Sequence, residues 1–347
     1  MGKIRIGTRE SQLAVWQATF VQKLLKQSGI ASQLVYIKSE GDIDTITPLY
    51  ALGVTGIFTK ALDAALLNST IDIAVHSMKD VPVQLAKGLK QAAVLKRGSH
   101  KDILVLHPDL STRDTSFNWT SITTTTMGSG SRVKESRWSV PLREHADRSG
   151  RLEDIVIATS SIRRIAQWLN KYPDHSIQNL RGNVNTRLRK LKESNWHGAI
   201  FAEAGLKRIN LRPENAVGLD WMLPAPAQGA MMIVCREEDD YAFKSCLSFN
   251  HEETALCTTI EREFLSALMG GCSTPISALA KVRKGNVTFK GNIASPDGRQ
   301  LLSVEVRRPL TDSTKMAGIA AESILSRGGQ TIIDRLRKKG LTANGEV

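Results

Sequence analysis

The stretch Ile71-Asp-Ile-Ala-Val-His-Ser-Met-Lys-Asp-Val-Pro82 decides the fold of this chain. Its first half is an apolar run typical of a parallel strand covered on both faces, and such strands present ligands to the residues just past their carboxyl ends. Lys79 and Asp80 stand at that position, so Asp80 is a candidate reacting carboxylate. The same pair also fits an ordinary solvated turn ahead of Pro82, and the rest of the chain must decide between the two interpretations.

Strand and helix patterns alternate along the chain on both sides of this stretch. Short apolar runs predict strands, and apolar residues spaced three and four apart predict amphipathic helices. By these criteria the preceding segment contains a strand over 3–8, a helix over 11–28, a strand over 33–38 and a helix over 57–67. A strand over 103–106 follows, and the alternation resumes at Ile155. Strands that alternate with helices indicate an α/β sheet.

Length and composition limit the class of protein. A chain of 347 residues is long enough for two or three domains of about 100 to 150 residues each. It contains no apolar run near the roughly 18 residues of a membrane span, and its first residues enter a strand pattern without the apolar core of a signal peptide. We therefore expect no association with a membrane.

The cysteines indicate a reducing compartment. They form no Cys-x-x-Cys pair and have no histidine pairs nearby at metal spacing, which argues against a zinc site. We interpret them as reduced thiols in a cytoplasmic protein that holds no metal. The four are Cys235, Cys246, Cys257 and Cys272.

The formal net charge of +13 predicts an anionic partner, whether a phosphate, a nucleic acid or a polycarboxylate. Between Arg151 and Arg212 there are twelve Lys and Arg against five Asp and Glu. This segment therefore carries more than half of the positive excess, and the positions of its arginines bear on which partner is bound.

Four segments place hydroxyls or cationic side chains at a turn from strand to helix or on the helix that follows it. Backbone N–H groups and the helix dipole favour an anion there, whereas arginines in a first helical turn oppose the dipole unless a ligand is present. The candidates are Arg9 and Ser11; Thr159 and Ser160 with Arg163 and Arg164; Arg181 with Arg187; and Lys207 with Arg208. Together they predict a cleft lined by arginine, the residue suited to bidentate contacts with carboxylate or phosphate.

Structural interpretations of these residues stay open. Ser11 alone fits a helix cap, and the run Arg189, Lys190 and Lys192 is typical of a solvated helix face. Nucleic-acid binding would require aromatic side chains among the basic residues, but aromatics make up only 5% of the chain and few lie near the arginines. The pattern therefore favours small carboxylates held by individually placed arginines.

One segment interrupts the α/β pattern. Twelve of the twenty-one residues from Ser111 to Ser131 are Ser or Thr, and a basic polar stretch follows as far as Gly150. A segment of this composition buries little apolar surface. We predict a polar insertion over about 110–150 and assign it no chemistry.

Seven motifs, taken together and in order, resemble the porphobilinogen deaminase family. The resemblance extends from residue 3 to about 340, and only the segment over 110–150 departs from it. The motifs are Ile6-Gly-Thr-Arg-Glu-Ser-Gln-Leu-Ala, Val75-His-Ser-Met-Lys-Asp-Val-Pro, Ala158-Thr-Ser-Ser-Ile-Arg-Arg, Leu180-Arg-Gly-Asn-Val-Asn-Thr-Arg-Leu, Ala204-Gly-Leu-Lys-Arg, Pro224-Ala-Pro-Ala-Gln-Gly-Ala and Gly270-Gly-Cys-Ser-Thr-Pro-Ile.

The resemblance implies an α/β fold with two periplasmic-binding-protein-like domains, an active-site cleft between them and a smaller α+β third domain. It places domain 1 at 1–98 and 229–249, domain 2 at 99–228 and domain 3 at 250–347. The chain would return to domain 1 for one strand over 231–236. In domain 3 the patterns fit a helix over 252–269, strands over 276–283, 286–294 and 301–307, and a last helix from Thr311.

The same resemblance implies a transferase of tetrapyrrole and haem biosynthesis. The family joins four porphobilinogens head to tail into hydroxymethylbilane and releases ammonia from each. It builds the product on a dipyrromethane cofactor bound covalently, through a thioether, to a cysteine that matches Cys272 here. Each ring carries an acetate and a propionate, so the growing chain accumulates carboxylates in the cleft, which explains the arginines. We expect a monomer that takes a small-molecule substrate and binds no nucleic acid.

By its position in the motif, Asp80 matches the family's catalytic aspartate, which stabilises the positive charge on the pyrrole as ammonia leaves. The resemblance also implies which residues bind carboxylates. Cofactor binding falls to Lys79, Thr159, Ser160, Arg163, Arg164, Arg187 and Arg208, and substrate binding falls to Arg9, Ser11 and Arg181.

Two features leave alternatives open. The loop from Gly53 to Ala61 lacks the lysine and the glutamate that the family pattern places at Thr55 and Ala61, so the contacts of this lid are not defined. A sensor built on the same binding-protein fold would need the arginines but neither Asp80 nor Cys272. A lone cysteine is most often structural. We interpret Cys235, Cys246 and Cys257 in this way.

Overall fold

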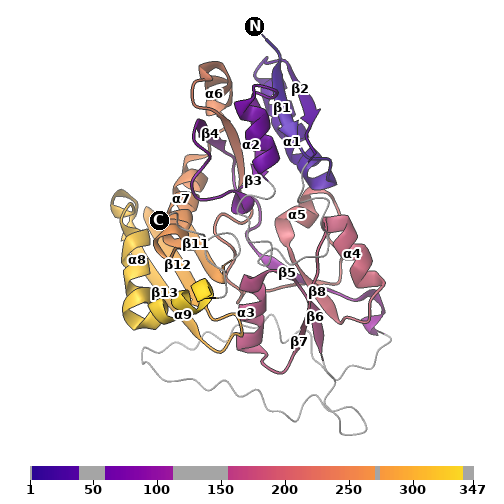
Figure 1. Cartoon of the computed structure of the whole chain (residues 1–347), viewed down its shortest axis with the longest axis vertical. Coiled ribbons are helices and arrows are strands. Elements are labelled where there is room, and N and C mark those ends of the chain that lie inside the picture. The colour runs from indigo at the N-terminus through magenta and orange to yellow at the C-terminus, as the bar shows by residue number, and fades with distance from the viewer. Residues whose placement is uncertain (1, 39–58, 112–154, 270–273, 339–347) are drawn as a thin grey trace.

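The computed structural model describes residues 2–38, 59–111, 155–269 and 274–338. Most of the predicted insertion, most of the loop over 53–61 and Cys272 lie outside these ranges. The described chain forms three β-sheets, each with its own helices (Figure 1). In this view the two larger sheets lie one above the other, and the third sheet lies beside them with α7, α8 and α9.

The first sheet contains the strand of the opening stretch, in the strand order β2-β1-β3-β10-β4. β1 pairs in parallel with β2 and β3, whereas β10 pairs antiparallel with β3 and β4. The strand that leads to Asp80 therefore has one parallel and one antiparallel neighbour, which corrects the expectation of a parallel strand. The bounds are β1 (Ile4–Thr8), β2 (Ser32–Tyr36), β3 (Ile73–Ser77), β4 (Leu89–Val94) and β10 (Met231–Arg236).

Both faces of the first sheet are covered by helices. Successive side chains of a strand point to opposite faces, and Ile73 and Val75 of β3 accordingly pack in one apolar cluster with α1 and α6, while Ala74 packs in another with α2. The prediction that β3 is covered on both faces is confirmed. The helices are α1 (Gln12–Gln27), α2 (Lys60–Leu67) and α6 (Asp240–Leu247).

The second sheet has the strand order β7-β6-β8-β5-β9, with β6 parallel to β7 and β8, and β5 antiparallel to β8 and β9. Trp168 of α3 packs on one face, and Leu191 and Leu206 of α4 and α5 pack on the other. The bounds are β5 (Asp102–Leu106), β6 (Val156–Ala158), β7 (Ser176–Gln178), β8 (Gly198–Ala202), β9 (Ala216–Gly218), α3 (Ile162–Lys171), α4 (Val184–Lys192) and α5 (Glu203–Arg208).

The third sheet is an antiparallel meander, β11-β12-β13, packed against three helices. Lys284 and Gly285 join β11 to β12, and both have positive φ, 48° and 71°, as a two-residue type I′ hairpin turn requires. The bounds are β11 (Ile276–Arg283), β12 (Asn286–Ala294), β13 (Leu301–Pro309), α7 (Glu252–Ala267), α8 (Met316–Ile324) and α9 (Gln330–Lys338).

The last helix begins later than the sequence predicts and is broken in two. The 3₁₀ turn Leu310–Asp312 follows β13, so the helix starts at Met316 and not at Thr311. A second interruption follows α8 because Gly328 has a φ of 94°, a left-handed conformation that an α-helix cannot contain. The single helix predicted from Thr311 is therefore wrong in its start and its continuity.

Two segments of chain run side by side between the first two sheets. One leads from β4 to β5 and the other from β9 to β10, and the amide of Gly98 donates to the carbonyl of Gly229 at 3.1 Å. Gly229 has a φ of 91°, and a Cβ there would lie 2.5 Å from the carbonyl oxygen of Ser99. Only glycine allows the two segments to approach this closely. Both predicted crossing points, near 98 and near 228, lie in these segments.

Among the helices of the described ranges, none combines the length and the apolar character needed to cross a lipid bilayer.

Candidate active site

The carboxyl end of β3 leads directly into the 3₁₀ turn Met78–Asp80, which holds the two residues that the opening stretch singled out. Lys79 is partly buried, and its Nζ lies 3.4 Å from Oε1 of Gln228, which belongs to the second crossing segment. Burial lowers the pKa of Lys79 to about 8, although the charge of the adjacent Asp80 acts in the opposite direction. The turn therefore presents a cation and a carboxylate together at the end of a buried strand.

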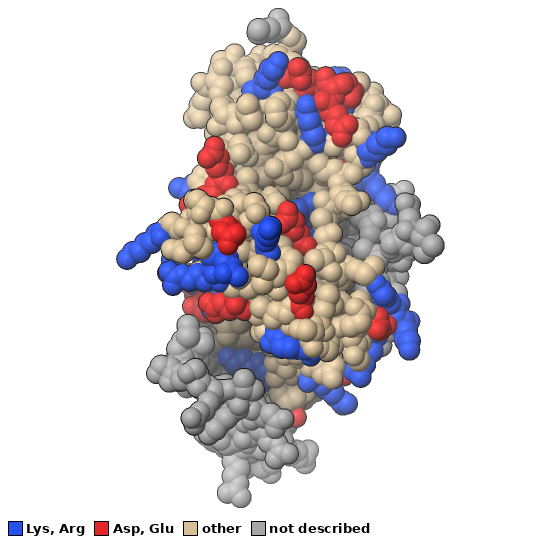
Figure 2. All heavy atoms as spheres, turned by 90° about the vertical axis from the view of Figure 1, so that its left-hand side faces the viewer, with Lys and Arg blue, Asp and Glu red and all other residues tan. Residues whose placement is uncertain are grey.

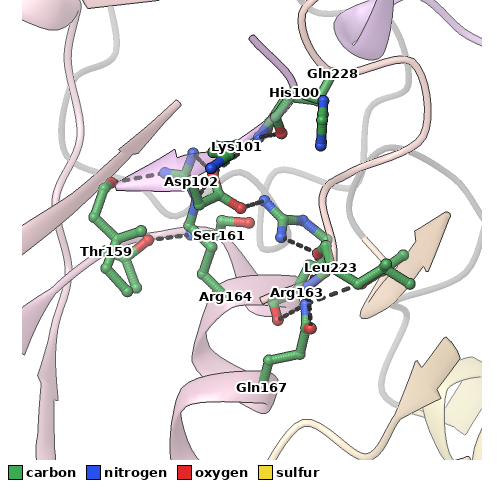
Figure 3. Close-up of polar contacts among 12 residues, drawn as sticks. His100, Lys101, Asp102, Thr159, Ser161, Arg163, Arg164, Gln167, Leu223 and Gln228 are labelled. Carbon is green, nitrogen blue, oxygen red and sulfur yellow. Dashed lines mark hydrogen bonds and ion pairs between the residues drawn. The ribbon is translucent and has the colours of Figure 1, made fainter. Parts of the chain in front are cut away.

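Asp102, the first residue of β5, is a buried carboxylate that organises the cations of the second sheet. Its side chain is 0% exposed, and Nη2 of Arg163 lies 2.8 Å from its Oδ2. Arg164 donates to its Oδ1 from Nε at 3.1 Å and from Nη2 at 2.8 Å (Figure 3). Gln228 donates to the same oxygen from Nε2 at 3.0 Å. The carboxylate thus joins the start of α3 to the crossing segment that contacts Lys79.

The charges around Asp102 do not balance. Burial raises the pKa of Asp102, but the charges of Arg163, Arg164 and Lys79 outweigh this effect. The net result is a pKa lowered to about 2, so the carboxylate is ionised. Three cations therefore act on this one buried anion, and Asp80, the other acid that acts on Lys79, still leaves positive charge in excess. Burying uncompensated charge is costly, and the arrangement is suited to receive further carboxylates.

Arg163 and Arg164 occupy the first turn of α3, as the sequence predicts. Each also donates to a backbone carbonyl, Arg163 to Leu223 at 2.8 Å and Arg164 to Ile200 at 2.7 Å. Among the described residues, the buried Nε of Arg163 has no hydrogen-bond partner. Burial lowers the pKa of Arg163, while Asp102 opposes this shift. Asp102 offsets the unfavourable helix dipole, and the orphaned Nε leaves one donor for an anionic ligand.

Arg187 and Arg181 extend this cationic group toward α4. Arg187 lies in the first turn of α4 and donates from Nε to the carbonyl of Gly182 at 2.7 Å. Burial lowers its pKa to about 10; the charges of Arg164 and Arg181 lower it as well, and Asp80 raises it. Arg181 is 3% exposed. These mutual effects indicate that the cations of the second sheet lie close to Asp80.

Arg208 connects the two larger sheets. Burial lowers its pKa to about 10, and it donates from Nη2 to the carbonyl of Gly229 at 2.7 Å. Its guanidinium lies 5.8 Å from the centre of the Trp16 ring on α1. A residue of α5 in the second sheet therefore contacts the first helix of the first sheet.

Arg208 and Lys207 lie on α5, the helix that follows β8, as the sequence predicts, and they occupy its last turn. Lys207 pairs with Glu203 at 3.0 Å and its side chain is 54% exposed, which removes it from the buried cluster. Arg189 is likewise exposed and pairs with Glu193 at 2.8 Å. The interpretation of Arg189 as part of a solvated face is confirmed.

Arg9 and Ser11 lie where β1 turns into α1. The Ser11 Oγ accepts from the amide of Ala14 at 3.4 Å, so Ser11 caps the helix. Arg9 lies near the buried His76 of β3. Burial lowers the pKa of this imidazole to about 4, and the charge of Arg9 contributes to the shift. Ser11 therefore has the structural role that its position alone suggested, and Arg9 lies beside the strand that ends at Lys79.

Thr159 and Ser160 follow β6 and are both buried. The Thr159 Oγ1 accepts from the amide of Ser161 at 3.3 Å, and the Ser160 hydroxyl donates to the carbonyl of Leu180 at 2.8 Å. The Ser160 hydroxyl therefore ties the start of α3 to the segment that carries Arg181, and the Thr159 hydroxyl stabilises the turn into α3.

Sequence reasoning missed Asp102 and Gln228. The signal for Asp102 is an acidic residue that opens the apolar run Ile103-Leu-Val-Leu, because a strand buried this deeply tolerates a carboxylate only when cations neutralise it. Gln228 lay within the quoted motif that begins at Pro224 but received no role.

The described cysteines are Cys235, Cys246 and Cys257, and all three are free and buried. Burial raises their pKa values to about 11, 12 and 11, respectively, so they are thiols at neutral pH. Their structural interpretation is consistent with this, whereas Cys272 lies outside the described residues. Within the described ranges, no cluster of His, Cys, Asp and Glu could hold a metal ion.

The fold and the site define a class of protein: an α/β protein with two five-stranded mixed sheets, a smaller third unit, and a group of buried cations around one buried carboxylate. A family model described as "Porphobilinogen deaminase, dipyromethane cofactor binding domain" matches residues 4–244, and one described as "Porphobilinogen deaminase, C-terminal domain" matches residues 255–326. The chain belongs to the porphobilinogen deaminase family.

A relative supports the same assignment. The chain is 38% identical over 345 residues to "Porphobilinogen deaminase, chloroplastic" from Oryza sativa subsp. japonica, covering 96% of this chain and 86% of the relative.

The solved structures that resemble the chain are distant. They include the methionine binding protein MetQ, at 14% identity and a TM-score of 0.38, covering 71% of this chain and 89% of that one. The VFT2 domain of BvgS from Bordetella pertussis has 11% identity and a TM-score of 0.36, covering 73% and 90%. Likeness at this level plays no part in the functional assignment.

Membership of the family makes the protein a transferase of tetrapyrrole biosynthesis with hydroxymethylbilane synthase activity and a dipyrromethane cofactor. The residues present fit such a cofactor. The cations around Asp102 suit the carboxylates of such a group, and the Nε of Arg163 is a buried donor without a partner among the described residues.

Proposed function

We propose that the cleft between the first two sheets polymerises porphobilinogen with Asp80 as the catalytic carboxylate. One observation carries this assignment: Lys79, Arg163 and Arg164 surround a single buried anion, Asp102, beside the turn that ends in Asp80. A cleft with this excess of buried cations favours a substrate that brings carboxylates of its own.

Asp80 acts on the charge that develops during the reaction. As ammonia leaves porphobilinogen, positive charge spreads over the pyrrole ring, and a fixed carboxylate at the ring N–H groups lowers the energy of that state. The end of a buried strand holds the carboxylate in place, which is why it needs no reorganisation when the charge appears. Asp80 also raises the pKa of Lys79 and of Arg187, so its own charge already acts on groups in the cleft.

The arginines hold the carboxylates of substrate and cofactor. Arg163, Arg164, Arg187 and Arg208, with Lys79, Thr159 and Ser160, bind the cofactor side chains, and Arg9, Ser11 and Arg181 bind the incoming substrate. Guanidinium groups suit this task because each offers two parallel N–H donors to a carboxylate and stays charged when buried. Backbone carbonyls fix Arg163, Arg187 and Arg208, so little side-chain entropy is lost when a carboxylate binds.

Cys272 anchors the dipyrromethane cofactor through a thioether. The cofactor, when bound, supplies a pyrrole with a free α-carbon to which the first substrate is joined. The deeply buried thiols of Cys235, Cys246 and Cys257, with raised pKa values, are poor candidates for this attachment.

The domain boundaries follow from the same assignment. We place domain 1 at 1–98 and 229–249, domain 2 at 99–228 and domain 3 at 250–347. In support, β10 lies in the first sheet although it follows β9 of the second. The paired segments at Gly98 and Gly229 are where the chain passes between the two domains.

We further propose a cytoplasmic monomer that binds no nucleic acid. The free thiols support a reducing compartment. On the face shown in Figure 2, Lys and Arg side chains are interspersed with Asp and Glu and do not form one continuous basic surface. A nucleic-acid site would need such a surface.

The test of this function is the turnover of an Asp80→Asn variant, which keeps the size of the side chain and removes its charge. Removing an electrostatic stabiliser of a developing charge costs about 2.7 to 4 kcal/mol, so turnover should fall at least about 100-fold. Asp174→Asn, a change at an exposed carboxylate of the second unit, is the matched control and should leave turnover unchanged. Activity within tenfold of the wild type in Asp80→Asn would remove Asp80 from the mechanism.

A further inference from the structure

A second cationic site lies outside the cleft. A cavity of about 320 Å³ opens where the segment after β9 meets the start of β5 and the strands β11 and β12. The polar part of its lining is formed by His100, Lys101, Lys281, Thr288 and Lys290, with Asp220 as its acidic residue. None of the residues that we assign to the described part of the cleft lines it.

Two of its lysines form ion pairs with exposed carboxylates. Lys101 pairs with Asp220 at 2.8 Å and Lys290 pairs with Glu305 at 3.1 Å. All four side chains are about half exposed, from 47% to 58%. Exposed pairs of this kind contribute about 0 to 1 kcal/mol, so an anion in the cavity can replace either carboxylate at little cost.

The third lysine, Lys281 of β11, has no acidic partner among the described residues. Burial lowers its pKa, and the charges of Arg283, Arg97, Lys101 and Lys290 lower it further. The charges that act most strongly on Lys281 are therefore all positive. The cavity is therefore a place of positive potential centred on a partly buried ammonium group.

His100 adds a neutral hydrogen-bonding group. Burial lowers its pKa to about 4, and the nearby cations, Lys281 first among them, lower it as well. At neutral pH the imidazole is therefore uncharged, and it can donate one N–H without an added charge. It complements the lysines by giving direction to an anionic group.

The remaining wall is apolar. Leu219, Met222 and Leu279 are 1%, 3% and 9% exposed, and Leu223 and Pro224 continue the same surface. Pockets for small molecules combine such an apolar wall with a few convergent polar groups. We propose that this cavity binds a small aromatic carboxylate, with its ring on the apolar wall and its carboxylate at Lys281.

The cavity and the cleft share contacts with one segment of chain. The carbonyl of Leu223, which lines the cavity, accepts from Nη1 of Arg163 at 2.8 Å (Figure 3). Gln228 donates to the carbonyl of His100 at 2.9 Å and also contacts Asp102. Because both sites attract carboxylates, the test must assign binding to one of them.

The experiment is a calorimetric titration of the holoenzyme with phthalate, an aromatic dicarboxylate. We expect Lys281→Gln to weaken phthalate binding at least about tenfold, or about 1.4 kcal/mol. Lys244→Gln, which changes an exposed lysine on α6, is the matched control and should bind like the wild type. Arg208→Lys, in the cleft, should also leave the affinity unchanged.

Three results of the phthalate titrations would overturn the proposal. They are the absence of phthalate binding to the wild type up to about 10 mM, equal affinity in Lys281→Gln, and loss of affinity in Arg208→Lys, which would assign the anion to the cleft. Lys290→Gln, at the more exposed edge, provides a second variant and should weaken binding by a smaller factor. Inorganic phosphate serves as the probe without an apolar body; if it binds as tightly as phthalate, the apolar wall has no part in recognition.

Discussion

Nη2 of Arg163 lies 2.8 Å from Oδ2 of Asp102, and the two side chains are 5% and 0% exposed. This contact joins the first turn of α3 to the first residue of β5. Because Asp102 also accepts from Arg164 and Gln228, one carboxylate holds two cleft arginines in fixed positions. The cations that we assign to cofactor binding therefore depend on Asp102, an acid to which we assign no contact with the cofactor.

Asp102→Asn should destabilise the protein strongly. The change leaves two buried guanidinium groups without their counter-charge, and breaking a buried ion pair from one side costs about 3 to 5 kcal/mol. Urea unfolding of the wild type and the variant measures the difference. Glu193→Gln, which breaks the exposed pair with Arg189, is the control and should change the free energy of unfolding by less than about 0.5 kcal/mol. A loss below about 1 kcal/mol in Asp102→Asn would contradict this role of the buried contact.

The same contact predicts a pH dependence of stability. The pKa of Asp102 is about 2 in the folded protein against 3.8 as the ordinary value. Its charged form is therefore favoured by folding, so its contribution is fully present above pH 4 and is lost as the pH falls toward 2. This shift corresponds to about 2 kcal/mol. The stability difference between wild type and Asp102→Asn should be constant above pH 4 and shrink below it; a difference that stays constant down to pH 2 would argue against the shift.

Lys79 should give the pH–rate profile a descending limb. Its pKa is lowered to about 8, so the free enzyme loses a cleft cation as the pH rises through that value. Because that cation attracts carboxylates, kcat/KM should fall above about pH 8. In Lys79→Arg the side chain stays charged, and the limb should move to higher pH even if the absolute rate is lower. Lys207→Arg is the control, and an identical limb in wild type and Lys79→Arg would assign the titration to another group.

The cleft arginines should not tolerate lysine. An ammonium keeps the charge but cannot make a planar two-pronged contact with a carboxylate. Replacing Arg163, Arg164, Arg187 or Arg208 by Lys should therefore slow turnover and leave enzyme-bound intermediates with one, two or three added pyrroles. Native mass spectra after addition of substrate would show these species. Arg189→Lys, which changes an exposed ion pair, is the control and should behave like the wild type. Wild-type turnover in all four cleft variants would mean that these arginines form only a general basic surface.

Local sequence patterns predicted most of the elements that build the cleft. The apolar run before Lys79 became β3, and the motif Thr159-Ser-Ser-Ile-Arg-Arg became the turn from β6 into α3. Both elements depend on the order of apolar and polar residues close together in the chain, and a single sequence is enough to reveal this order. The strand over 231–236 is predicted only by the family resemblance, because its partners β3 and β4 are far away in the chain.

What the sequence did not reveal depends on tertiary contacts. Asp102 looked like one acid among many because its role comes from burial beside Arg163 and Arg164. The position of Arg208 at the end of α5 depends on where a short helix stops, and single-sequence patterns define such ends poorly. Gly328 interrupts the last helix by adopting a positive φ, which its presence in the sequence permits but does not require.

The central claim is that this chain builds its product on a dipyrromethane attached to Cys272. The intact mass of the purified protein tests it most directly. The wild type should be heavier than its sequence by one two-pyrrole unit, and Cys272→Ser should lose that mass while Cys257→Ala, a change at a buried thiol, keeps it. An active wild type with the unmodified mass of its sequence, or an adduct that persists in Cys272→Ser, would contradict the account.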